Sequence, residues 1–236
     1  MDSQTELLHH TPAGDTDATP VAIFDLDGTL VDSAMDVAGA INPVLRRHGL
    51  PPLDRAQAAA LMGNGLRRFA EGAFQQHGRA VEEADVAAFV ESYEARPVVH
   101  SRLYPEVPET LRALANAGWR MVVCTNKAER LATTILQRLG ILACFDAVCG
   151  SDTAPARKPD PRHLEAALAR AGLLRHPAVM IGDYVADLAA ARAYGVPSVF
   201  AGWGYGDAAL GEDATCTAQR FAMLPTLLEG LARRAG

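Results

Sequence analysis

From residue 117 onward, short apolar runs alternate with segments that have helical periodicity. Such alternation is typical of a parallel sheet, because neighbouring parallel strands need a crossover connection, usually a helix. Together with an apolar run near the N-terminus, the expected strands cover residues 21–24, 119–124, 145–149, 178–181 and 196–200. The expected helices between them cover residues 128–139, 161–171 and 186–194. We therefore predict an α/β core with a parallel five-stranded sheet and helices on both of its faces.

Residues 36–97 differ from the rest, because they show helical periodicity and no convincing strand. They lie between the first and second expected strands, where a crossover needs far fewer residues. An inserted helical domain accounts for this length. The predicted organisation is a flexible N-terminal extension (1–19), a core (20–35 and 98–236) and a helical domain (36–97), with hinges near residues 31–36 and 97–105.

The charge and composition of the chain argue against several classes of function. Its 236 residues carry a net charge of −6, which disfavours a general nucleic-acid or anionic-membrane surface. No apolar run approaches the roughly 20 residues that a membrane span needs, and the first 20 residues lack the apolar region of a secretory signal. The four cysteines show neither CxxC spacing nor a dense disulfide framework. We expect a cytoplasmic protein with no nucleic-acid or membrane partner.

The first expected strand ends in Phe24-Asp25-Leu26-Asp27-Gly28-Thr29, where two carboxylates stand one residue apart. In an extended segment, Asp25 and Asp27 project to the same side while Leu26 faces the other way. Two negative charges buried this close are costly unless a cation or another partner compensates them. A strand that ends in an Asx turn would explain the motif if it stood alone. It does not explain why later strands also end in polar residues.

Polar side chains follow the other strands at the sheet edge where open parallel sheets bind ligands. They are Thr125, Asn126 and Lys127 after the second strand, Lys158 before the expected helix 161–171, and Asp183 and Asp187 after the fourth strand. Each alone could be a helix cap or a solvated charge, but their common placement predicts one site. Of the 22 basic residues, only Lys127 and Lys158 are lysines, and both fall in these clusters.

The chemistry of this set favours a metal ion and a phosphoryl group. Crowded carboxylates suit Mg²⁺ with several retained waters, whereas lysine, threonine and backbone N–H groups suit phosphoryl oxygens. A carboxylate beside phosphorus can attack it and form an aspartyl-phosphate. A second carboxylate can then protonate the leaving alkoxide and later activate water.

These motifs resemble those of haloacid dehalogenase superfamily phosphatases over about residues 20–230. The superfamily motifs are the segment 25–33, Thr125-Asn126, Lys158, and Gly182-Asp183 with Asp187. The chain is further similar to the phosphoglycolate phosphatases in Gly63-Asn64-Gly65, Tyr104-Pro105 and the segments 124–127 and 150–161. The resemblance implies a Rossmann-like core, a helical cap that closes over the site, and Mg²⁺-dependent hydrolysis of a small phosphorylated metabolite, with 2-phosphoglycolate as the expected substrate.

The resemblance also implies roles around the metal ion. Asp25 would be the nucleophile and Asp27 the general acid/base. Mg²⁺ would be bound by the Asp25 side chain, the Asp27 backbone carbonyl and Asp183, while Asp187 would orient Asp183 or a water on the metal. Tyr184 departs from the family pattern, which commonly has a serine there. The resemblance therefore implies the metal site itself but not the residues that surround it.

The expected phosphoryl and substrate contacts come from other positions of the same motifs. Thr125 and Lys158 would hold phosphoryl oxygens and support catalysis, with Asn126 beside them. Gly28 and Thr29 are also expected to contact the substrate, through the turn that follows the two carboxylates.

Specificity is expected to come from the cap, notably from the Gly63-Asn64-Gly65 loop with Asn64 and from Arg67 or Arg68. Two arginines just inside a helix N-terminus oppose the helix dipole, although solvation would also explain them. Our hypothesis is that one of them, represented by Arg68, meets the carboxylate of 2-phosphoglycolate when the cap closes.

Several alternatives remain at this point. A dehalogenase is disfavoured, because a leaving-group proton from Asp27 and a complete set of metal ligands suit the hydrolysis of phosphate esters. A phosphonate-cleaving relative needs a cap lysine and a mutase resembling β-phosphoglucomutase is also expected to have one, but residues 36–100 contain none. The serious competitors are a phosphatase for another small sugar or acid phosphate and a non-catalytic regulatory protein. A monomer and a homodimer are both compatible with the sequence.

Overall fold

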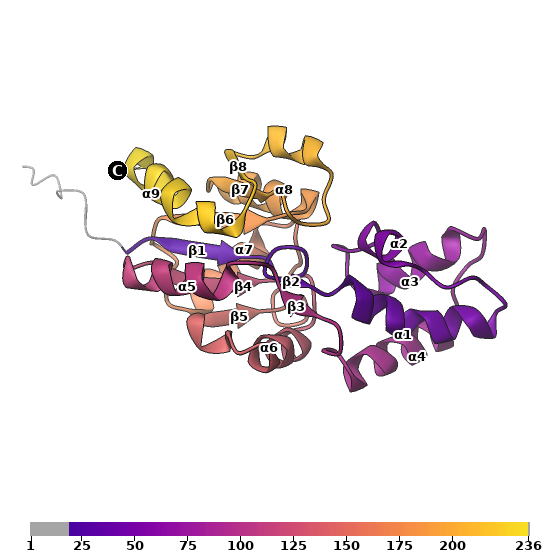
Figure 1. The fold of residues 1–236 in the computed structure, drawn as a ribbon. Helices are drawn as coiled ribbons and strands as arrows, with labels where there is room; N and C mark the ends of the chain where they lie inside the picture. Colours follow the sequence, from indigo (N-terminus) through magenta and orange to yellow (C-terminus); the bar gives the residue numbers. More distant parts are fainter. Residues whose placement is uncertain (1–18, 236) are drawn as a thin grey trace, which may run out of the picture.

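The structure, a computed structural model, describes residues 19–235. Its centre is a sheet of six parallel strands within this range, in the order β5-β4-β1-β6-β7-β8 (Figure 1). In that order the strands are Ala147–Cys149, Arg120–Cys124, Val21–Phe24, Ala178–Gly182, Ser198–Ala201 and Cys216–Ala218. The predicted N-terminal extension lies outside the described residues except for Thr19.

The predicted α/β class is confirmed, but the predicted number of five strands is wrong. The missed strand is β8, which pairs with β7 from Val199↔Cys216 to Ala201↔Ala218. It has three residues and a threonine at its centre, so it forms no apolar run that a sequence pattern could detect. The segment becomes a strand because its backbone pairs with β7, and its own sequence has no strand pattern.

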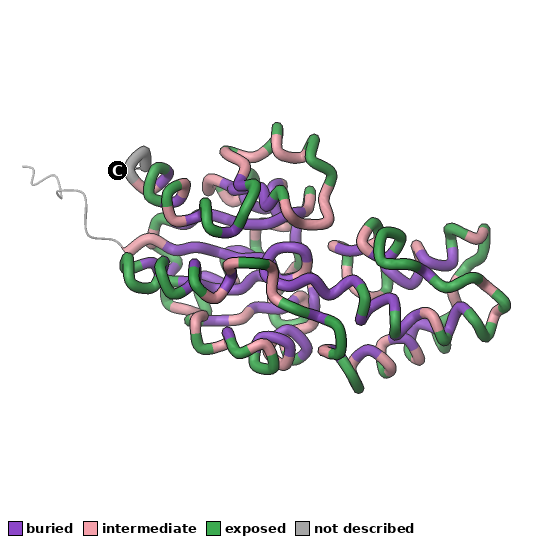
Figure 2. Tube along the Cα trace, viewed as in Figure 1, coloured by how far each residue is buried: buried purple, intermediate pink, exposed green. Residues whose placement is uncertain are grey.

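Helices cover both faces of the sheet. Phe24, which points to one face, shares a hydrophobic cluster with α5, α6 and α9, whereas Ile23 shares another with α7 and α8. The strands are almost entirely buried between these layers (Figure 2). The helices are α5 (Val107–Asn116), α6 (Glu129–Arg138), α7 (Arg162–Arg170), α8 (Val185–Tyr194) and α9 (Leu224–Ala235), with short 3₁₀ helices at Leu142–Cys144, Ala208–Asp213 and Phe221–Met223.

Four further helices lie together at the end of the sheet to which β1 points (Figure 1). They are α1 (Ala34–Arg47), α2 (Arg55–Ala59), α3 (Leu66–Gln75) and α4 (Glu83–Ala95), and we call them the four-helix unit. Aromatic side chains fill its interior, with the rings of Phe69 and Phe89 stacked at 5.7 Å. The unit joins the core through two strands, β2 (Val31–Asp32) and β3 (Arg102–Leu103), which pair antiparallel.

Asp36 ties these two connections together. Its buried carboxylate accepts hydrogen bonds from the backbone N–H groups of Val99, His100 and Ser101 and from the Ser101 hydroxyl, at 2.6–3.1 Å. Burial opposes the charged form, but these hydrogen bonds outweigh it and lower the pKa of Asp36 below its usual value.

Replacing Asp36 with asparagine is therefore expected to lower the free energy of unfolding by about 1–3 kcal/mol at pH 7. A lowered folded-state pKa means that the contribution is present above the unfolded pKa and is lost as pH falls through the folded pKa. The difference between wild type and Asp36→Asn should accordingly shrink below about pH 4. Urea unfolding of wild type and variant at pH 7 and below about pH 4 checks this. The exposed Glu91→Gln of α4 is the control. A difference that stays constant with pH would contradict the assignment.

Candidate active site

Strand register brings the predicted polar residues to one edge of the sheet. Phe24 of β1 pairs with Val123 of β4 and with Ile181 of β6, so the three strands end level with one another. Asp25 follows Phe24 directly, and its N–H donates to the Ile181 carbonyl at 2.9 Å. The chain then turns sharply, since the Leu26 carbonyl accepts hydrogen bonds from the N–H groups of Thr29, Leu30 and Val31. Leu26 is fully buried in the core, while both aspartates line the same cavity, as the alternation predicts.

Gly28 is required in this turn for two reasons. Its φ of +85° is a left-handed conformation that residues with a Cβ rarely adopt. A Cβ at this position would also overlap the Asp183 carboxylate. The turn can therefore lie directly against the Asp183 carboxylate only with glycine at this position.

Lys158 is the central cation of the site. Its ammonium lies 2.7 Å from Asp25 Oδ1 and 2.7 Å from Asp187 Oδ1, and it donates to the Cys124 carbonyl at 2.5 Å. Its side chain is 1% exposed. Burial would lower the pKa of Lys158, but the charges of Asp187 and Asp25 raise it above its usual value, so the ammonium stays charged.

Three buried carboxylates, from Asp25, Asp183 and Asp187, form the acidic cluster, in which one oxygen from each lies within 4.8 Å of the other two. Thr29 Oγ1 donates to Asp183 Oδ1 at 3.0 Å, and the Tyr205 N–H donates to Asp183 Oδ2 at 2.8 Å. Burial raises the pKa of Asp25 to about 7, against the opposing charge of Lys158. Burial, then the charges of Asp25 and Asp187, raise the pKa of Asp183 well above its usual value.

This acidic cluster fits a divalent cation. The three carboxylates have one ammonium among them, and it contacts only Asp25 and Asp187. The ionised cluster therefore carries excess negative charge in a buried setting, and a hard cation with oxygen ligands would compensate it. The raised pKa values of Asp25 and Asp183 have the same origin, because burial and neighbouring negative charge both disfavour the ionised carboxylate. Asp187 also accepts from the Tyr184 N–H at 3.0 Å through its other oxygen, so both of its oxygens already have protein partners. The metal assignments of individual residues stay predictions.

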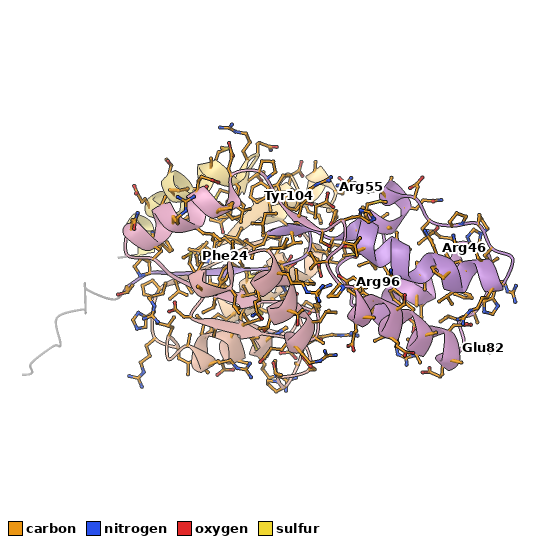
Figure 3. The ribbon with its side chains drawn as sticks, turned by 60° about the horizontal axis from the view of Figure 1, so that its bottom comes forward. Phe24, Arg46, Arg55, Glu82, Arg96 and Tyr104 are labelled. Carbon is orange, nitrogen blue, oxygen red and sulfur yellow. The ribbon has the colours of Figure 1, made fainter. Side chains whose placement is uncertain are left out.

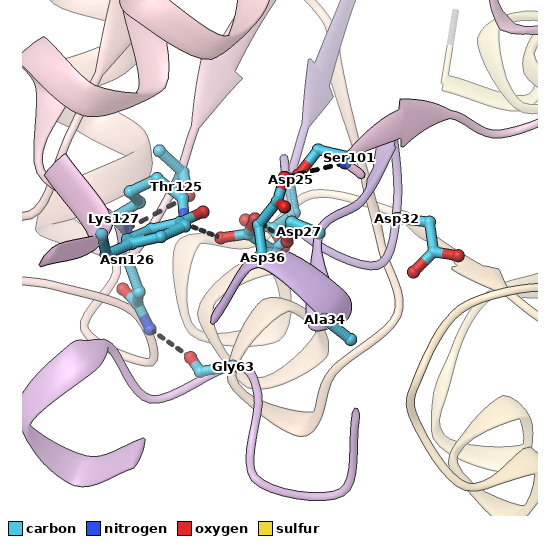
Figure 4. A network of polar contacts seen from close by, with 12 residues as sticks. Asp25, Asp27, Asp32, Ala34, Asp36, Gly63, Ser101, Thr125, Asn126 and Lys127 are labelled. Carbon is cyan, nitrogen blue, oxygen red and sulfur yellow. Dashed lines mark hydrogen bonds and ion pairs between the residues drawn. The ribbon is translucent and has the colours of Figure 1, made fainter. Parts of the chain in front are cut away.

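The Asp27 side chain lies outside the acidic cluster and has its own partners. Its Oδ2 lies 2.8 Å from the ammonium of Lys127, and its Oδ1 accepts from the Ser33 hydroxyl at 2.5 Å (Figure 4). Lys127 Nζ also donates to the hydroxyl of Tyr93, which belongs to α4, at 3.2 Å. Burial would lower the pKa of Lys127, but Asp27 and Tyr93 raise it above its usual value.

Thr125 and Asn126 form the neighbouring wall. Thr125 is buried, and its N–H donates to the Cys149 carbonyl of β5 at 3.0 Å. The Asn126 amide donates to the Gly63 carbonyl at 3.1 Å and so joins the four-helix unit to the core (Figure 4). It also donates to the Lys158 carbonyl at 3.1 Å. Its Oδ1 is buried and has no hydrogen-bond partner among residues 19–235, which leaves an acceptor available in this wall.

A cavity of about 30 Å³ lies between the strand ends and the four-helix unit. It is lined from the core by Asp25, Asp27, Thr125, Asn126 and Lys127, and from the four-helix unit by Val37, Leu61, Met62, Gly63, Gly65, Leu66 and Phe69. A water molecule needs about 10–15 Å³ of such space, so the cavity has room for one or two waters. The structure thus shows the four-helix unit packed closely over the strand ends.

The polar residues predicted in the four-helix unit are not part of this cavity wall. Asn64 Nδ2 donates to the Tyr184 hydroxyl at 2.9 Å on the exposed surface. Arg67 pairs with Glu83 at 2.6 Å and Arg68 with Glu71 at 2.8 Å, and both arginine side chains are more than half exposed. The structure brings the glycines of the loop to the site, and the substrate roles of Asn64 and Arg68 stay predictions.

Sequence reasoning did not identify the residues that hold the charged groups of the site, two of which come from distant segments. Ser33 and Tyr93 hold Asp27 and Lys127, and Tyr205 holds Asp183. The sequence holds two signals for them: Lys127 is one of only two lysines, and Tyr205 lies in the glycine-rich segment 202–206. No comparable signal marks Tyr93.

Comparison with known proteins places this site in a family. A family model for haloacid dehalogenase-like hydrolases matches residues 22–201. The chain belongs to this family. A phosphoglycolate phosphatase of Caulobacter vibrioides is 43% identical over 186 residues, which cover 77% of this chain and 78% of that protein. One from Agrobacterium fabrum is 39% identical over 219 residues, covering 90% and 94%.

Solved structures agree with this membership. A crystal structure described as a predicted phosphoglycolate phosphatase, from Haemophilus somnus, has a TM-score of 0.80 and 29% identity and covers 88% of this chain and 97% of that one. The predicted superfamily and the resemblance to phosphoglycolate phosphatases are confirmed, and so is the prediction of a hydrolase of the phosphatase type. Within residues 19–235, the haloacid dehalogenase-like fold has no helix both long and apolar enough to cross a membrane.

Proposed function

We propose that this protein is a Mg²⁺-dependent phosphatase that hydrolyses 2-phosphoglycolate to glycolate and phosphate. The observation that carries the proposal is the meeting of Asp25, Asp183, Asp187 and Lys158 at one sheet edge. Asp25 and Asp27 line one cavity there. The relatives named phosphoglycolate phosphatase support the choice of substrate.

In the proposed reaction, an Asp25 oxygen forms a bond to phosphorus while the bond from phosphorus to the glycolate oxygen breaks. The leaving alkoxide takes a proton from Asp27, which is protonated at this stage. Water then attacks the phosphorus of the aspartyl-phosphate, gives its proton to Asp27, and the Asp25 carboxylate is released with phosphate. Lys158, next to Asp25, and Thr125 would hold the phosphoryl oxygens.

Asp25, Asp183 and the Asp27 backbone carbonyl would hold Mg²⁺, with Asp187 orienting them. When bound, Mg²⁺ would compensate the charge of the phosphoryl group and of the carboxylates around it. We further propose that the four-helix unit is the cap. A cavity of about 30 Å³ holds only one or two waters, so the proposal requires this unit to move when substrate binds.

A substrate panel tests this function directly. Phosphate release from 2-phosphoglycolate, from other small sugar and acid phosphates and from p-nitrophenyl phosphate is compared with and without Mg²⁺. The expected result is Mg²⁺-dependent release with the highest kcat/KM for 2-phosphoglycolate. A higher value for another metabolite would overturn the substrate assignment, and no release from any ester would overturn the enzymatic function in favour of a regulatory binding protein.

The predicted role of the cap arginines has its own test. If Arg68 or Arg67 meets the substrate carboxylate, replacing that arginine with alanine should raise KM for 2-phosphoglycolate about 10-fold or more, because a hydrogen bond to a charged group is lost. KM for p-nitrophenyl phosphate, which has no carboxylate, should change little. The exposed Arg46→Ala, at the far end of the four-helix unit (Figure 3), is the matched control. Equal effects on both substrates would reject the hypothesis.

A further inference from the structure

Lys127 is a buried cation for which the proposed reaction has no role. Its side chain is 4% exposed, and its ammonium lies 2.8 Å from Asp27 Oδ2. The other lysine, Lys158, forms its ion pairs with Asp25 and Asp187 of the acidic cluster, so it does not replace Lys127. The 20 remaining basic residues are arginines. A compact ammonium instead of a guanidinium fork suits a confined site that needs one point charge.

Both oxygens of Asp27 are held. Lys127 binds Oδ2, and the Ser33 hydroxyl donates to Oδ1. Ser33 is the N-cap residue of α1, yet its side chain makes no capping hydrogen bond, because the hydroxyl is used for Asp27. The Tyr205 hydroxyl takes over the capping role by accepting from the N–H groups of Ser33 and Ala34 at 2.7 and 3.1 Å. The geometry therefore favours a fixed orientation of the Asp27 carboxylate over ordinary capping of the helix.

Lys127 is itself held by the four-helix unit. The Tyr93 hydroxyl accepts from its ammonium at 3.2 Å, and the ammonium lies 4.8 Å from the centre of the Tyr93 ring, within cation–π range. Tyr93 is fully buried. It belongs to the last turns of α4, whose N-cap Glu82 lies at the outer end of the four-helix unit and whose C-cap Arg96 lies at the end nearer the core (Figure 3). The contact therefore exists only while the end of α4 is docked on the core.

We infer that Lys127 is a positioning residue that orients Asp27 for proton transfer to the leaving group, and that Tyr93 makes this orientation depend on docking of the four-helix unit. The inference rests on the proposed function, because it assigns Asp27 the role of general acid. A chain Tyr93–Lys127–Asp27 then links the position of the proposed cap to the proton donor. Docking of the four-helix unit then fixes Lys127 through Tyr93, and Lys127 in turn orients Asp27 while this unit covers the site.

The test uses the leaving group as the readout. Glycolate leaves as a basic alkoxide that needs a proton, whereas p-nitrophenolate leaves without one. The value of kcat/KM covers steps only up to phosphoryl transfer to Asp25, so the later hydrolysis of the aspartyl-phosphate does not obscure the comparison. Lys127→Met is expected to lower kcat/KM about 100-fold for 2-phosphoglycolate and less than about 5-fold for p-nitrophenyl phosphate. A purely structural role would lower both alike.

Tyr93→Phe removes only the hydroxyl and keeps the packed ring. It is expected to lower the ratio of the two kcat/KM values about 3- to 10-fold in the same direction, because one hydrogen bond to a charged group is lost. Tyr194→Phe on α8, far from the strand ends, is the matched control and should leave the ratio unchanged.

The outcomes separate the inference from the proposed function. Equal losses on both substrates in Lys127→Met would overturn the positioning role, and an unchanged ratio in Tyr93→Phe would overturn the link to the four-helix unit. If Lys127→Met does not fold, an unchanged ratio in Tyr93→Phe overturns the inference as a whole, because the Tyr93–Lys127–Asp27 chain then has no measurable effect on proton transfer. A wild-type protein that releases phosphate from neither substrate would instead refute the proposed function.

Discussion

Replacing Asp25 with asparagine is expected to lower kcat for phosphate release by more than about 10³-fold. The amide has nearly the shape of the carboxylate but cannot attack phosphorus, so the aspartyl-phosphate cannot form. The nearest other carboxylates do not substitute, since neither Asp183 nor Asp187 lines the cavity that Asp25 lines. Both oxygens of Asp187 contact protein groups, as do both oxygens of Asp183. Phosphate release from 2-phosphoglycolate and p-nitrophenyl phosphate, at saturating Mg²⁺, measures the effect.

The control for this substitution is Asp213→Asn, an exposed change at the end of a 3₁₀ helix on the core. It should keep wild-type activity. Asp25→Asn should still fold, because it removes one of three crowded carboxylates rather than a packing group. Activity of the folded variant within 10-fold of wild type would exclude Asp25 as the nucleophile.

Replacing Lys158 with methionine is expected to lower the free energy of unfolding of the metal-free protein by about 3–5 kcal/mol. Methionine fills much of the same space but leaves the buried carboxylates of Asp25 and Asp187 without their shared cation. Removing one member of a buried ion pair is costly because the remaining charge has neither water nor a partner. Urea unfolding at pH 8 measures the effect.

A double substitution tests whether charge is the cause. Asp25→Asn in the Lys158→Met background removes one of the two stranded carboxylates, so it should restore part of the lost stability. The interaction energy from this cycle should be on the order of 1–3 kcal/mol. Arg138→Met on the exposed surface of α6 serves as the control and should change stability by less than about 0.5 kcal/mol. Strictly additive effects would show that Lys158 stabilises the fold by packing rather than by its charge.

Much of the core could be predicted because its information is local. Alternating apolar runs and helical periodicity located β1, β4, β5, β6 and β7, and the polar residues just beyond three of them predicted the site. Asp25, Thr125 and Asp183 come together because parallel strands in register end at one edge. This follows from the type of sheet and needs no knowledge of individual side-chain contacts.

The residues that hold the reacting groups could not be predicted in this way. Tyr93 and Lys127 are 34 positions apart, and Thr29 and Asp183 are 154 apart, so no local pattern connects them. The short strand β8 likewise depends on pairing with β7, and Arg67 and Arg68 form ion pairs away from the cavity although they follow its glycine loop.

The sequence by itself thus determined the fold class and the set of chemical groups at the strand ends, because periodicity and strand termini are properties of neighbouring residues. Only the tertiary structure decided which ammonium binds which carboxylate and how the four-helix unit meets the core. Those choices depend on the packing of distant segments, where a shift of one helical turn would exchange one partner for another.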